Sequence, residues 1–226
     1  MNLLTSIQSP QRRDCDPPHN LGEIERRKMV GVLAFVKQPA RKIIHGQAID
    51  EMSEAGRDQC VAIRQALRSV RATQVSGYCS TARRANDALR LILADHTNSR
   101  NNTHTALEPL RKDDFSAQFE TARKDQIDQI TKLVKRHICE AQALAKNIRM
   151  LCVHITHSHI VEKLLASFIV GEGRLSAEDL VGETLAPGTL WQLQIFKNER
   201  GILELEVSLG RKVLQARPGL LPSLLS

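Results

Sequence analysis

The chain has 226 residues, enough for one large α/β domain, and its 42% hydrophobic residues can supply a substantial core. Aromatic residues make up only 3%, which argues against binding single-stranded nucleic acid by base stacking. The net charge is +7, and residues 1–90 carry 15 Lys and Arg against 9 Asp and Glu. This basic excess fits either attraction of anionic ligands or an ordinary basic surface.

The first 38 residues form an expected leader segment, partly disordered or helical, because residues 1–20 are polar and contain three prolines. The spacing of Met29, Leu33 and Val36 fits a helix that Pro39 stops. Residues 30–36 are also apolar enough for a strand, so the pattern leaves both structures open.

Strands and helices alternate across the expected domain, residues 39–212. A strand at 41–44 would deliver His45 to its carboxyl end, and Ser53 can cap the helix that follows. Further strands are expected at 74–79, 150–155, 189–196 and 202–209, and further helices at 82–94, 118–147 and from 160 onward. Residues 95–105 read as a loop, 107–110 as a weak strand and 213–226 as a C-terminal tail.

This alternation predicts an α/β fold of three layers, in which helices flank a largely parallel sheet. Ligands of such folds bind beyond the carboxyl ends of the strands. His45 and His157 each follow an expected strand, and Arg84 lies just past a third. The prediction is therefore that two imidazoles and one guanidinium meet at one rim of the sheet.

Four segments in order carry the chemical signal: residues 43–48 (IIHGQA), 53–59 (SEAGRDQ), 80–85 (STARRA) and 156–159 (THSH). Together they resemble the histidine phosphatase superfamily, also called phosphoglycerate mutase-like. The resemblance implies the corresponding three-layer fold. It also implies hydrolysis of a phosphomonoester through a phosphohistidine at His45, without a metal or organic cofactor. The partner would then be a phosphorylated small molecule or a phosphoprotein.

The resemblance also assigns roles in phosphate binding. Arg84 would hold the equatorial phosphoryl oxygens, His157 would bind the phosphoryl group, and Gly46 would let the backbone approach it closely. Gln47 and Ala48, together with Gly56 and Gln59, match positions that brace the pocket loop and the first helix.

Two departures from the family pattern bear on activity. Ile44 stands where the motif Arg-His-Gly has its arginine, and Lys112 stands where many relatives have a catalytic glutamate. The acid would then be Asp113 or Glu108, and Lys112 could supply the positive charge that Ile44 lacks. The alternative hypothesis is a catalytically inactive relative that binds a phosphorylated ligand or protein partner.

Other sites and locations are less well supported by the sequence. The five cysteines are widely spaced without a CxxC pair, which is typical of reduced thiols rather than a disulfide framework or zinc site. The spacing of His154, His157 and His159 does not put all three on one face of a strand, so no metal site is expected. Without a recognisable signal peptide, membrane span or nucleic-acid-binding motif, we expect a cytoplasmic protein with no membrane or nucleic-acid partner.

Overall fold

The computed structural model describes residues 27–96, 99–108, 117–145, 147–169, 185–210, 212–214, 216–217 and 219–225. Seven strands form one sheet in the order β5-β4-β6-β1-β7-β8-β9. The strands are β1 (Lys28–Lys37), β4 (Gln74–Cys79), β5 (Arg100–Thr103), β6 (Met150–Thr156), β7 (Leu190–Lys197), β8 (Leu203–Leu209) and β9 (Lys212–Leu214). The first four in the sheet order are parallel, whereas β7, β8 and β9 continue it as an antiparallel meander.

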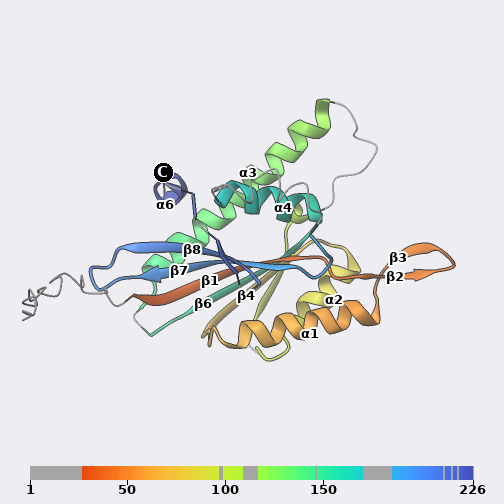
Figure 1. Cartoon of the computed structure of the whole chain (residues 1–226), viewed down its shortest axis with the longest axis horizontal. Helices are drawn as coiled ribbons and strands as arrows, with labels where there is room; N and C mark the ends of the chain where they lie inside the picture. The colour runs from red at the N-terminus through yellow and green to blue at the C-terminus, as the bar shows by residue number, and fades with distance from the viewer. Residues whose placement is uncertain are drawn as a thin grey trace, which may run out of the picture.

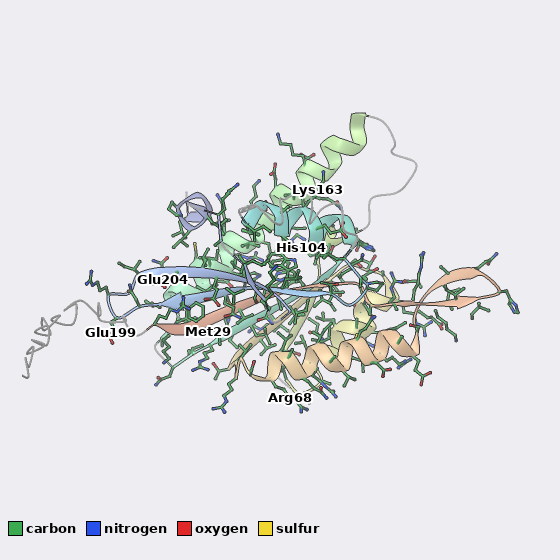
Figure 2. All side chains as sticks on the ribbon, in the orientation of Figure 1. Met29, Arg68, His104, Lys163, Glu199 and Glu204 are labelled. Carbon is green, nitrogen blue, oxygen red and sulfur yellow. The ribbon has the colours of Figure 1, made fainter. Side chains whose placement is uncertain are left out.

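Helices cover both faces of this sheet (Figure 1). One face packs against α1 (Glu54–Arg68) and α2 (Arg83–Ile92), and the other against α3 (Ala117–Ala143), α4 (Ser158–Phe168) and the short α6 (Leu220–Leu225). A 3-10 helix, Thr105–Leu107, follows β5. Side chains fill the space between the sheet and both helical layers (Figure 2). The three-layer α/β fold expected from the sequence is confirmed.

The strand β1 lies at the centre of the sheet, between β6 and β7. Residues 30–37 are all buried, since helices cover both faces and a hydrogen-bonded strand lies on each side. A continuous apolar run is what such a strand requires, so the strand reading of residues 30–36 is confirmed and the helix reading is wrong. The expected domain start at residue 39 is corrected accordingly, because the domain includes β1.

The C-terminal residues also belong to the domain. β9 extends the sheet by pairing with β8, and Leu220 and Leu224 of α6 are buried in the core above the sheet. The expectation of a tail from residue 213 is therefore wrong. The weak strand expected at 107–110 is also absent where the structure describes that segment, since residues 105–107 are helical and the strand β5 lies before them.

A row of stacked rings crosses four neighbouring strands. Phe35 of β1 stacks on Trp191 of β7 and on His154 of β6, with ring centroids 4.3 and 4.6 Å apart. Tyr78 of β4 stacks on the other side of His154 at 5.2 Å. Because these residues are paired in the sheet register, the row fixes the relative alignment of the strands whose ends form the site.

No helix in the described part of the chain is long and apolar enough to cross a membrane.

Candidate active site

The candidate site lies where the parallel strands β1, β4 and β6 end. The residue after β1 is Gln38, the residue after β4 is Ser80 and the residue after β6 is His157. The backbone N–H of Gln38 donates to the carbonyl of Thr156 at 2.9 Å, which extends the pairing of β1 with β6 to this edge. Arg84 joins them from the first turn of α2.

The amide of Gln38 connects these four residues. Its Oε1 accepts a hydrogen bond from Nη2 of Arg84. Its Nε2 lies 3.3 Å from Oγ of Ser80 and 3.4 Å from Nε2 of His157. Gln38 is only 5% exposed, so its amide forms a fixed floor to the site.

The guanidinium of Arg84 carries a charge that the protein only partly compensates. It makes no ion pair among the described residues, and its buried Nε has no hydrogen-bond partner there. Burial lowers the pKa of Arg84, Asp50 acts in the opposite direction, and the positive charge of Arg41 lowers the pKa further. A half-buried cation bonded to a neutral amide is a suitable receptor for an anion.

Lys37, the last residue of β1, uses its charge elsewhere. Its Nζ donates to the carbonyl of Leu185 and lies 3.8 Å from Oε1 of Glu162 on α4. The same carboxylate accepts from the backbone N–H of Leu185 at 3.0 Å. Because Lys37 is only 6% exposed, this pairing satisfies a charge that burial would otherwise make costly.

The start of α1 braces the loop that follows Gln38. The carbonyl of Ala40 accepts hydrogen bonds from the backbone N–H and the Oγ of Ser53. The backbone N–H of Ala40 donates to Oε1 of Gln59 at 3.0 Å. Ser53 also caps the helix by accepting from the N–H of Gly56. Of the residues expected to brace the pocket loop and the first helix, Gln59 thus bonds to Ala40 and Gly56 to Ser53.

His45 lies on a different element. Two strands, β2 (Arg41–Ile44) and β3 (Gln47–Met52), form a separate antiparallel hairpin, here called the arm (residues 41–52), which extends away from the main sheet (Figure 1). His45 and Gly46 are its two-residue turn, with φ of 49° and 76°, as a type I′ turn requires. Along an extended strand, His45 is about 13 Å beyond Arg41.

The expectation that residues 41–44 deliver a nucleophile to the rim of the main sheet is therefore wrong. His45, Gly46 and Gln47 are exposed at the end of the arm, and Ile44 lies beside them. The strand that ends between β6 and β7 at the rim is β1, and the residue it presents there is Gln38. The structure brings Arg84 and His157 together around Gln38, and it does not bring His45 to them.

The candidate acids have different outcomes. Glu108 lies at the rim, where its Oε1 accepts from the backbone N–H of Thr81 and its carbonyl accepts from Gln126 at 2.8 Å. Lys112 and Asp113 lie outside the described residues. His154 is buried in the row of stacked rings and is not at the rim.

Sequence reasoning did not place Lys37 or Gln38 at the site, and it noted Ser80 only as the first residue of the segment 80–85. The apolar run 30–36 followed by Pro39 was compatible with a buried strand ending at this point, but it fitted a helix as well. A two-residue His-Gly unit between Ile44 and Gln47 was equally a hairpin signal.

Neither protein-family models nor curated proteins match the sequence. Solved structures do match its fold. A mycobacterial glucosyl-3-phosphoglycerate phosphatase is similar over 79% of this chain and 97% of its own, with 18% identity and a TM-score of 0.50. Mycobacterial hydrolase 2 is similar over 85% and 95%, with 16% identity and a TM-score of 0.53. YhfR of Bacillus stearothermophilus is similar over 78% and 95%, with 11% identity and a TM-score of 0.50.

These structures are members of the histidine phosphatase superfamily, and the chain has the fold of that superfamily. The fold predicted from the motif order is thus confirmed.

Proposed function

We propose that this protein is a phosphatase-like module that binds the anionic group of a phosphorylated small molecule or phosphoprotein without hydrolysing it. The proposal rests on the position of Gln38, which lies at the end of the central strand β1 beside Arg84 and His157. That is the place where the resemblance calls for a nucleophilic histidine.

Glutamine cannot replace histidine as the nucleophile. A neutral imidazole has a free lone pair on nitrogen near pH 7, whereas the nitrogen lone pair of an amide is delocalised into the carbonyl. Attack on phosphorus by Gln38 is therefore not expected. The charge of Lys37 is also committed to Glu162, which leaves one fewer cation to stabilise a transition state.

The same residues suit anion binding. Arg84 offers a charge that no described carboxylate pairs with, and its Nε is an unused buried donor. Gln38 holds the guanidinium in place, and the imidazole of His157 lies beside the same amide, with its Nε2 3.4 Å from Nε2 of Gln38. A phosphoryl group would meet preorganised donors rather than flexible ones, which lowers the entropic cost of binding.

The hydrolytic alternative keeps His45 as the nucleophile and comes from the sequence motif. It predicts turnover of a generic aryl phosphate that is lost in His45→Ala. The binding hypothesis predicts no turnover by either the parent or His45→Ala.

Calorimetry with inorganic phosphate and with tungstate tests the proposal, using Arg84→Ala and its neighbour Arg83→Ala as a matched pair. Arg83 is 71% exposed in its side chain and pairs with Glu51, so its loss removes the same charge outside the site. We expect Arg84→Ala to weaken binding by about tenfold or more, since one charge-assisted hydrogen bond has that value. Arg83→Ala should stay within about twofold. Equal effects of the two substitutions, or turnover that depends on His45, would contradict the proposal.

A further inference from the structure

The arm contacts the body of the protein at the start of α2. The helix has Ala82 at its N-cap position, and this residue offers no side-chain hydrogen bond. Asp50 of β3 supplies one instead, since its Oδ2 accepts from the backbone N–H of Arg83 at 2.7 Å. A carboxylate from one element thus caps the helix that carries Arg84.

Neighbouring ion pairs hold Asp50 in this position. Oε1 of Glu51 lies 3.1 Å from Nη1 of Arg83, and Oε2 of Glu51 lies 3.9 Å from Nζ of Lys42. These pairs are exposed, so each contributes little alone. The pair of Glu51 with Arg83 and the bond from Asp50 fasten the base of the arm to the first turn of α2, whereas the pair of Glu51 with Lys42 joins the two strands of the arm.

The carboxylate of Asp50 also acts on the candidate site. Its charge interacts favourably with Arg84, the next residue after the one that it caps. Backbone N–H groups at a helix start and a guanidinium are the donors that a bound oxyanion uses. Asp50 therefore stands where a protein-borne anion competes with a ligand's anion for the same positive potential.

We infer that Asp50 is a built-in competitor for the site, so that the arm sets the affinity of Arg84 for phosphoryl groups. This inference rests on the proposed function. Binding of a dianion brings it towards a carboxylate of like charge, and the fastened arm prevents Asp50 from moving away without breaking the cap. The affinity of the parent protein for a simple oxyanion is therefore lower than the cationic site alone would give.

Asp50→Asn separates charge from capping. Asparagine keeps a side-chain oxygen that can accept from Arg83, so the helix cap survives while the charge is lost. Asp87→Asn is the matched control. Asp87 lies on α2, the helix that carries Arg84, and its Oδ2 lies 4.0 Å from Nε of Arg83. The overall change of charge is identical in the two variants.

The experiment is calorimetric titration of the full chain with tungstate at low and high salt. We expect Asp50→Asn to bind about tenfold more tightly than the parent at low salt, with a smaller gain at high salt, and Asp87→Asn to stay within about twofold. The thermal midpoint of Asp50→Asn should match that of the parent. Asp50→Ala should also bind more tightly but unfold at a lower temperature, because it loses the cap.

Two results would overturn the inference in distinguishable ways. If Asp50→Asn binds tungstate as the parent does while Arg84→Ala abolishes binding, Asp50 is only a helix cap and the proposed function stands. If Arg84→Ala leaves tungstate binding unchanged, the proposed site itself is wrong, and the role of Asp50 is lost with it.

Discussion

The contact between α1 and the loop after Gln38 makes Gly56 the position where one added methyl group should do most harm. A Cβ at Gly56 would lie 2.4 Å from the carbonyl oxygen of Ala40 and 2.6 Å from Cγ of Met52. The Met52 side chain can move, but the Ala40 carbonyl is backbone and accepts two hydrogen bonds from Ser53. Gly56→Ala must therefore push the loop away from the helix.

The expected cost follows from three opposing contributions. Alanine in a helix is favoured over glycine by about 1 kcal/mol. Overpacking against a rigid atom costs about 1–3 kcal/mol, and each of the two weakened hydrogen bonds costs about 0.5–1.5 kcal/mol. The net loss in the free energy of unfolding is about 1–5 kcal/mol, with a central value of about 3 kcal/mol. The loop begins at Gln38, so tungstate affinity should fall as well.

Urea unfolding of the parent, Gly56→Ala and Gly31→Ala measures this cost. Gly31 is the control because a Cβ there would meet its nearest neighbours, Ala141 and Ile195, at 3.4 Å, close to ordinary contact. We expect Gly31→Ala to lose no more than about 1 kcal/mol. Equal stability of the two variants, with unchanged tungstate binding in Gly56→Ala, would refute the bracing argument.

Two further substitutions test the site floor and the core. Gln38→Leu should lower the free energy of unfolding by about 2–4 kcal/mol, because it removes the acceptor for Arg84 and the donor to Ser80 from a buried network. A free energy of unfolding within about 0.5 kcal/mol of the parent, measured by thermal unfolding, would contradict this. Burial lowers the pKa of His137 and lowers that of His154 well below its usual value, so below about pH 6.5 the unfolded chain binds more protons than the folded one. Stability should therefore be constant above that pH and fall as the pH decreases, by up to about 1.4 kcal/mol per pH unit for each histidine. His154→Phe should flatten the slope in urea unfolding at pH 5.5 and 7.5, and an unchanged slope would exclude this origin.

Periodicity predicted most of the elements that form the layers. The helical spacing in residues 118–147 corresponds to α3, and the apolar run before His157 corresponds to the buried strand β6. These patterns are reliable because burial on one face of a helix, or on both faces of a parallel strand, dictates which positions must be apolar.

The position of the central strand could not be fixed in the same way. Residues 30–36 are uniformly apolar and carry no period, so helix and strand fit equally until the neighbours β6 and β7 are known. The pair His45-Gly46 matched a family motif, yet two residues with positive φ between short strands also make a hairpin turn. The dipeptide His-Gly fits both the family motif and a hairpin turn, and only the pairing of β2 with β3 distinguishes the two interpretations.

The site was therefore only partly predictable. Arg84 and His157 were expected from the family resemblance and from their positions past expected strands, because the carboxyl ends of parallel strands meet at one rim. Gln38 was missed because glutamine has no distinctive chemistry in a sequence, and its meaning depends on its contacts with those two residues. The capping of α2 by Asp50 from the arm is a long-range contact that no local pattern indicates.

A crystal structure of the protein soaked with tungstate tests the central claim most directly. We expect one tungstate, held without a covalent bond, within hydrogen-bond distance of Arg84 and His157 above the amide of Gln38. Tungstate bound at His45 with Arg84 uninvolved would contradict the assignment of the site to the end of β1.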